Sequence, residues 1–118
     1  MSLVKRVTSH NFVDEVIESR LPVLVDFYAD WCGPCRMLSP ALEAIASEFA
    51  GRVKIVKLNV DEEPDIASHF DIQSIPTLLA FNGHRQMDRL VGIGSPGQLR
   101  QVLMRMAESS HQLAVDAG

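Results

Sequence analysis

The sequence predicts an α/β fold: a central, mixed but mostly parallel five-stranded sheet with helices on both faces, in the order β-α-β-α-β-α-β-β-α. Three observations predict it. Apolar, β-rich runs alternate with segments of helical periodicity through the first half of the 118 residues, which is typical of parallel strands joined by helices. Residues 23–29 are mostly apolar without alternation, which indicates a strand covered on both faces. Two later strand-like runs flank Asn82-Gly83, a common hairpin turn.

The first half of the chain is expected to contain three strands and two helices. Pro22 separates the first helix from the second strand. Pro34 suits the first turn of the second helix, because backbone N–H groups have no helical partner there and the missing N–H of proline costs nothing. Pro40 predicts a kink in this helix, and Gly51 a stop after it. In chain order, the strand, helix, strand, helix and strand are expected over residues 3–7, 12–17, 23–29, 34–49 and 53–60.

The second half is expected to hold a short helix, a hairpin and a last helix. The acidic run 61–65 with its proline indicates a helix start, since acids are favourable near the positive end of a helix. Strands are expected over 77–81 and 87–91. Ser95-Pro96-Gly97-Gln98 resembles a capping box, followed by an apolar stripe from Leu99 to Met106. We expect one domain over residues 1–107 and a mobile C-terminal extension over residues 108–118.

Composition excludes several classes of function. The net charge of −4 and a pI near 5.5 give no basic patch for nucleic acid. No apolar run approaches the ~18 residues of a membrane span, and the N-terminal residues lack the apolar segment of a secretory signal. We therefore expect a soluble, cytoplasmic protein without nucleic-acid or membrane partners, and a monomer as the default state.

The chemistry is concentrated in Trp31-Cys32-Gly33-Pro34-Cys35, which holds both cysteines of the chain. A zinc site would need about four ligands, and the four histidines are scattered. A structural disulfide would close a very small loop, with little entropic benefit. A redox-inactive role in partner binding is a third alternative. Reversible dithiol–disulfide exchange fits best, because Cys32 would lie at a helix N-terminus that favours its thiolate, with Cys35 one turn further on the buried face.

Two ionisable residues lie near this pair in the predicted sheet. Asp26 is the one acid within the apolar strand 23–29, where burial would raise its pKa; alternatively it points to an edge or pairs with a cation. Lys57 lies on an otherwise apolar face of the next strand, where it either modulates Asp26 or extends to the surface.

Three segments, residues 25–35, 56–61 and 75–77, together with Gly83 and Gly92, resemble the thioredoxin family. The resemblance runs from about residue 3 to residue 107, and the Trp-Cys-Gly-Pro-Cys string with the later Ile-Pro-Thr is highly specific. It implies the thioredoxin fold and a protein disulfide reductase. In this family Cys32 would be the nucleophile and Cys35 the resolving thiol.

The resemblance also implies roles for residues outside the cysteine pair. Asp26 would accept a proton from Cys35 through water. Pro76 would follow a cis peptide bond beside the cysteines, and Gly33 and Pro34 would tune the redox chemistry. We define the docking surface for target proteins as the residues expected around Cys32, namely Trp31, Gly33, Pro34, Ile75, Pro76, Gly92 and Ile93.

The family implies no bound cofactor. Electrons would come from NADPH through a flavoprotein thioredoxin reductase, and the other partners would be disulfide-containing target proteins. Two alternatives stay open: a thiol oxidase or isomerase, and a redox-independent scaffold or partner-binding subunit that uses the apolar surface around the cysteines. The chain departs from the family at Tyr28, where many members have tryptophan, and at the 82–83 turn, where the hairpin register is uncertain by about one residue.

Overall fold

The computed structural model describes the backbone of residues 2–117 and the side chains of residues 2–109. Its elements alternate as the sequence predicts, and the short helix η1 is a π-helix. In chain order they are β1 (Lys5–Arg6), η1 (Val13–Ile17), β2 (Val23–Tyr28), α1 (Gly33–Glu48), β3 (Lys54–Asn59), α2 (Pro64–His69), β4 (Thr77–Asn82), β5 (Arg85–Val91) and α3 (Pro96–Ala117).

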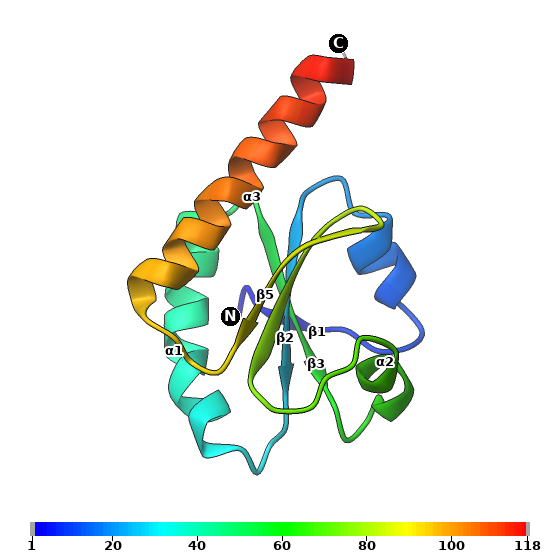
Figure 1. Ribbon diagram of the computed structural model, residues 1–118, viewed down its shortest axis with the longest axis vertical. Helices are drawn as coiled ribbons and strands as arrows, with labels where there is room; N and C mark the ends of the chain where they lie inside the picture. The colour runs from blue at the N-terminus through cyan, green and yellow to red at the C-terminus, as the bar shows by residue number, and fades with distance from the viewer. Residues whose placement is uncertain (1, 118) are drawn as a thin grey trace.

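The five strands form one sheet in the order β1-β3-β2-β4-β5. β1 and β2 run parallel to β3, whereas β4 runs antiparallel to both β2 and β5. The predicted mixed, mostly parallel sheet is confirmed for its first three strands, and the hairpin completes it. The carboxyl end of β2, the central strand, leads directly into the cysteine segment at the start of α1 (Figure 1).

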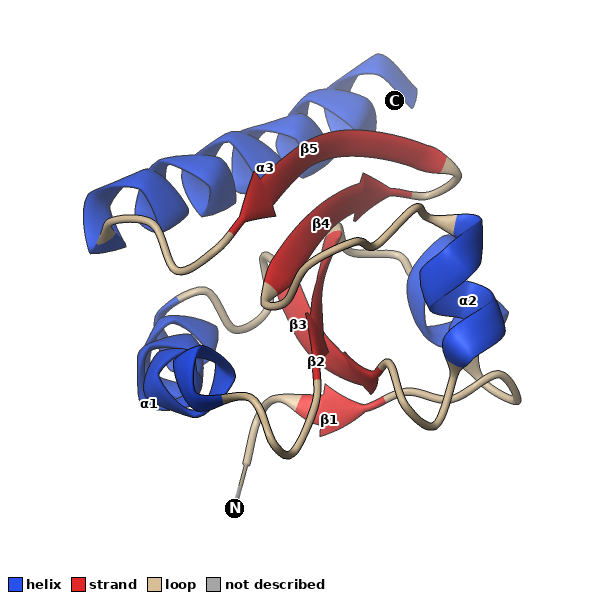
Figure 2. Cartoon of the chain, turned by 60° about the horizontal axis from the view of Figure 1, so that its bottom comes forward, coloured by secondary structure: helices blue, strands red, loops and turns tan. Residues whose placement is uncertain are grey.

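Apolar side chains cover both faces of the sheet, as the run 23–29 predicts. α1 and α3 lie on one face, and α2 and η1 lie on the other (Figure 2). Leu24 of β2 packs with the residues of α1 and α3, whereas Val25 and Phe27 pack with those of η1 and α2. Because side chains alternate along a strand, Asp26 shares the face of Leu24 and lies on the α1 side.

Several boundaries differ from the expected ones. The first strand is confined to Lys5–Arg6 instead of residues 3–7, and β2 ends at Tyr28 instead of residue 29. The first helix is a five-residue π-helix, although its apolar pattern indicates an ordinary helix. α1 begins at Gly33, one residue before Pro34, and Pro40 lies inside it.

The hairpin turn lies one residue later than the Asn-Gly pair suggests. Asn82 still belongs to β4 and pairs with Arg85, so Gly83 and His84 form the turn. Gly83 has a φ of 62°, a conformation that suits glycine at the first central position of such turns. The register shifts between Ala80 and Phe81, which is a β-bulge in the hairpin. The pairing of Asn82 with Arg85 and this bulge define the hairpin register, which the sequence predicts only to within about one residue.

α3 begins as its capping signal predicts, since the N–H of Gln98 donates to Oγ of Ser95 (3.2 Å). Leu99, Leu103 and Met106 are buried. The helix continues to Ala117 and extends beyond the sheet (Figure 1), past the apolar stripe that predicts it. The mobility expected for residues 108–118 stays a prediction. Within residues 2–117, no helix combines the length and apolar character needed to cross a membrane.

Candidate active site

Cys32 is the N-cap residue of α1, and Cys35 lies in the first turn of the helix. The two cysteines form a disulfide with a Cα–Cα distance of 5.3 Å. The backbone N–H of Cys35 donates to Sγ of Cys32 (3.2 Å). This N–H is one of the first four in the helix, which have no partner within it. The sequence therefore places Cys32 where backbone N–H groups and the positive helix end stabilise a thiolate.

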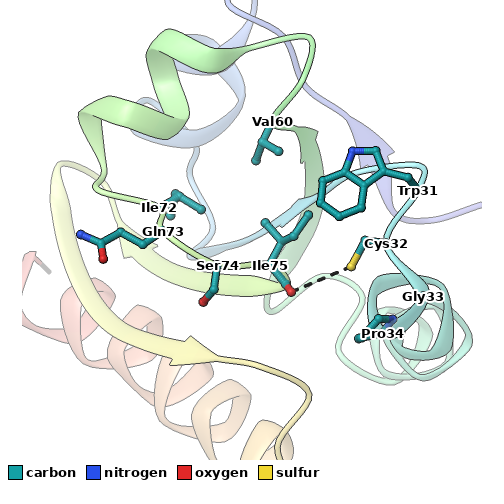
Figure 3. A pocket seen from close by; sticks show the side chains of 9 residues that line it. All are labelled: Trp31, Cys32, Gly33, Pro34, Val60, Ile72, Gln73, Ser74 and Ile75. Atoms are coloured by element: carbon teal, nitrogen blue, oxygen red, sulfur yellow. Dashed lines mark hydrogen bonds between the residues drawn. The ribbon is translucent and has the colours of Figure 1, made fainter.

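The two sulfurs face different surroundings. Each cysteine is only 4% exposed, so Cys32 is as buried as Cys35 in this oxidised state. Cys32 nevertheless borders an open hollow of about 440 Å³, whereas Cys35 borders a separate cavity of about 190 Å³ that contains Asp26. The hollow beside Cys32 is lined by Trp31, Cys32, Gly33, Pro34, Val60, Ile72, Gln73, Ser74 and Ile75 (Figure 3).

Ile75 reaches Cys32 because β4 runs antiparallel to β2. The pairing of Phe27 with Thr77 brings the start of β4 to the end of β2. The Ile75–Pro76 peptide bond is cis, as the resemblance implies, and Pro76 is buried. The carbonyl oxygen of Ile75 lies 3.9 Å from Sγ of Cys32 (Figure 3). The backbone of Ile75 thus lies beside the sulfur, from a position more than forty residues along the chain.

Trp31 is 68% exposed, so it is a surface residue and not a core aromatic. Its indole N–H donates to a carboxylate oxygen of Asp61 (2.8 Å). β2 and β3 are paired up to Tyr28 and Asn59, so the segments that follow the two strands leave the sheet side by side. Sequence reasoning missed Asp61, because an acid in the run 61–65 has the simple interpretation of a solvated helix start.

Gly92 and Ile93 are the last two residues of the predicted docking surface. The N–H of Gly92 donates to the carbonyl oxygen of Pro76 (2.8 Å), and its φ of 85° is one that favours glycine. Ile93 is 39% exposed. Neither residue lines the hollow beside Cys32. Gly92 is nevertheless hydrogen-bonded to Pro76, which directly follows the lining residues 72–75.

Asp26 is buried on the α1 face of the sheet. It is 4% exposed, and its Oδ1 has no hydrogen-bond partner. Burial raises the pKa of Asp26 to about 7, and the charge of Lys57 opposes this rise. An unpartnered carboxyl group that changes charge near neutral pH is an unusual core residue, and it opens onto the same cavity as Cys35.

Lys57 lies directly beside Asp26, since the two are register partners on β3 and β2. Its ammonium group lies 5.5 Å from the centre of the Tyr28 ring, and both residues line the Asp26 cavity. None of the ion pairs among the described side chains joins Lys57 to Asp26. Lys57 therefore acts on Asp26 through the electrostatic field and not through a direct salt bridge.

The comparison with known families agrees with this geometry. The sequence model of the Thioredoxin family matches residues 3–105. The chain belongs to the thioredoxin family. It is 48% identical to Thioredoxin 1 from Nostoc sp. over 103 residues, which are 87% of this chain and 96% of that protein. It is also 50% identical to a thioredoxin from Synechocystis sp. over 78% of this chain and 86% of that protein, and 46% identical to one from Rickettsia felis over 82% and 92%.

Like other thioredoxins, this protein is a protein-disulfide oxidoreductase that reduces protein disulfides, and Cys32 with Cys35 is its redox pair. Its partners are, in general terms, a reductase and disulfide-containing proteins. The side chains of residues 2–109 include no group of three or more His, Cys, Asp or Glu that could hold a metal ion.

Sequence reasoning missed part of the wall of this thioredoxin site. Ile72, Gln73 and Ser74 line the hollow beside Cys32, yet the sequence shows them only as a connector between a helix and a strand. Ser39, one turn after Cys35, lines the Asp26 cavity. The helical spacing of Ser39 from Cys35 is the one signal that could have found it, since residues four apart share a helix face.

Proposed function

We propose that Cys32 is the attacking thiolate and Cys35 the resolving thiol. The thiolate of Cys32 attacks one sulfur of a target disulfide, forms a mixed disulfide, and releases the other target sulfur as a thiolate. The thiolate of Cys35 then attacks Sγ of Cys32 and displaces the remaining target sulfur. The target gains two electrons, and the Cys32–Cys35 disulfide is formed. The observation that carries this assignment is that Cys32 borders the open hollow and Cys35 the Asp26 cavity.

We assign to Asp26 the proton that Cys35 must lose before it attacks. A base is most effective when its pKa is near the working pH, and burial raises the pKa of Asp26 to about 7. The cavity of about 190 Å³ that borders both residues has room for water, which would carry the proton between them. The positive charge of Lys57 favours the ionised form of Asp26 and so keeps the carboxylate available.

The hollow beside Cys32 is the proposed docking site for an extended target segment. Trp31, Gly33, Pro34 and Ile75 contribute to its largely apolar lining, and Pro76, Gly92 and Ile93 continue the docking surface. The backbone of Ile75 lies beside the attacking sulfur, where it can pair with a target in the manner of an added strand. Gly33 and Pro34, between the cysteines, set the local geometry of the pair and so tune its redox chemistry.

We further propose that NADPH supplies the electrons through a flavoprotein thioredoxin reductase, and that the protein acts as a cytoplasmic monomer with no bound cofactor. Support comes from family membership and from the chemistry of the site, because the cysteine pair completes the exchange by itself. A reducing compartment is consistent with the two cysteines, since both belong to the redox pair and neither is needed as a separate structural crosslink.

Trapping tests the assignment of the two cysteines. Cys35→Ser is expected to accumulate mixed disulfides between Cys32 and its targets, because the resolving thiol is absent. Non-reducing electrophoresis of the reduced variant mixed with an oxidised target measures this, and mass spectrometry of the trapped species locates the bond. The matched control is Cys32→Ser, which should trap far less. Equal trapping by the two variants would contradict the assignment.

Loss of the Trp31–Asp61 hydrogen bond is expected to weaken docking. Trp31→Phe and Asp61→Ala should each raise KM for insulin about threefold in the reductase-coupled assay, because the aromatic ring at position 31 is no longer fixed at the wall of the hollow by a hydrogen bond. The double variant should be no worse than either single variant. Asp65→Ala, which removes another exposed acid from the same run, is the control. Additive effects of the two changes would show that the bond is not responsible.

A further inference from the structure

The wall of the hollow opposite α1 is a connector with no regular structure. It joins α2 to β4 and carries Ile72 and Ile75, which face the hollow (Figure 3). At its start Asp71 has a φ of 56°, a left-handed conformation that few residues adopt readily. Helix α2, which precedes it, is only six residues long. The backbone N–H groups of Asp71 and Ile72 donate to the carbonyl oxygens of Ser68 and Ala67 (3.0 and 2.9 Å), which joins the start of the connector to α2. Because α2 is so short, side-chain contacts with the sheet also contribute to the position of this segment.

Arg89 of β5 makes a side-chain contact at the beginning of the connector. Arg89 pairs with Leu79 of β4, so its side chain lies on the face of the sheet that carries α2. Its guanidinium group donates to the carbonyl oxygen of Phe70 and, at 3.3 Å, to that of Asp71. These carbonyls follow the end of α2, where acceptors lack helical partners and the helix dipole favours a cation.

The charge of Arg89 is directed at these carbonyl groups. Arg89 is half-buried, and it is absent from the ion pairs found among the described side chains. A planar guanidinium can present separate N–H groups to two adjacent carbonyl oxygens, which the single ammonium of lysine does less well. The arginine thus ties β5 to the connector by two hydrogen bonds with a charged donor.

Two further hydrogen bonds extend this attachment toward the cysteines. The amide of Gln73 donates to a carboxylate oxygen of Asp71 (3.0 Å), and the hydroxyl of Thr77 donates to the carbonyl oxygen of Ser74 (2.7 Å). The connector is therefore fixed near both ends, by Arg89 on one side and Thr77 on the other. Ile75 lies between these attachments, with its carbonyl oxygen 3.9 Å from Sγ of Cys32.

We propose that Arg89 is a positioning residue for protein-disulfide substrates. It holds the connector so that the backbone of Ile75 is already in place when a target segment docks beside Cys32. Without it, part of the binding free energy would be used to order the connector, and KM would rise. The cysteines themselves would react as before, since Arg89 does not touch them. The inference rests on the proposed docking role of this segment.

Arg89→Ala is expected to raise KM for insulin about fivefold in the reductase-coupled assay, with kcat changed less than about twofold. The reaction of the reduced protein with the small disulfide reagent DTNB should be unchanged, because that reagent needs no docking surface. Backbone amides of residues 72–75 should exchange with solvent faster than in the unchanged protein. Arg85→Ala is the matched control, because it removes an exposed arginine from the same strand and should alter none of these quantities.

Arg89→Lys keeps the charge and should recover part of the lost affinity, and it provides a second test if Arg89→Ala does not fold. Wild-type KM and wild-type exchange of residues 72–75 in both variants would overturn the inference. So would an equal loss of activity toward insulin and DTNB, which would show a general defect. Failure of the proposed function gives a different result: the unchanged protein would not reduce insulin, and the amide exchange of Arg89→Ala would then decide alone whether the arginine holds the connector.

Discussion

Replacing Cys32 by serine is expected to abolish NADPH-coupled insulin reduction, with a loss of more than about a thousandfold. Serine supplies a hydroxyl oxygen in place of the Cys32 sulfur as the N-cap acceptor for the N–H of Cys35, so α1 should keep its start. It has no thiolate to attack a disulfide, however, and its alkoxide is not accessible at neutral pH. The measurement is the rate of NADPH oxidation in the presence of a thioredoxin reductase and insulin.

The same variants separate the proposed mechanism from its alternatives. Full turnover by Cys32→Ser would show that the assignment of the nucleophile is wrong. Biological activity that survives replacement of both cysteines by serine would favour a redox-independent scaffold. A redox potential well toward the oxidising end of the range known for such dithiols would favour a thiol oxidase or isomerase.

Asp26→Asn is expected to stabilise the protein at neutral and alkaline pH, by about 2–4 kcal/mol at about pH 8. Burial raises the pKa of Asp26 from 3.8 to about 7. Between these values the folded protein keeps the proton that the unfolded chain loses, so stability falls as pH rises through this range. An amide cannot ionise, and it avoids this loss, although its own burial retains some cost.

The stabilisation by Asp26→Asn should therefore disappear below about pH 4, where the carboxyl group is neutral in both states. Urea unfolding of the oxidised protein at several pH values measures it. Glu18→Gln, which neutralises an exposed acid, is the control and should change stability by less than about 0.5 kcal/mol throughout. A gain from Asp26→Asn that does not depend on pH would contradict a buried, ionisable Asp26.

The sequence predicts best the strands whose apolar residues are buried on both faces of the sheet. β2 and β3 lie within one residue of their expected ranges, because their apolar residues serve two cores at once. The hairpin is less predictable. Asn82-Gly83 is a strong local signal, but the bulge between Ala80 and Phe81 moves the turn by one residue. Such a shift depends on packing against the rest of the sheet, which no short segment reveals.

Some residues of the candidate site can likewise be predicted from the sequence, and others cannot. Cys32, Cys35 and Asp26 are found from the sequence, since each is an unusual residue in its local context. Asp61 and Arg89 are not, because an exposed acid at a helix start and an arginine on an edge strand are both ordinary. Asp61 accepts a hydrogen bond from Trp31, which lies 30 residues away in the sequence. Arg89 donates to carbonyl groups just after the end of α2, which lie 18 and 19 residues away. Only the folded topology brings these partners together.

The antiparallel pairing of β4 with the central strand has a consequence for folding. Contacts between distant parts of a chain carry a large entropic cost for closing the loop between them, and they tend to form late. A partly folded chain in which β4 has not yet docked on β2 has both thiols but lacks Ile75 and Pro76 beside them. On the proposed docking role of Ile75 and Pro76, such a chain would exchange disulfides with little selectivity. Discrimination among targets would then be acquired only when the last strands of the sheet are in place.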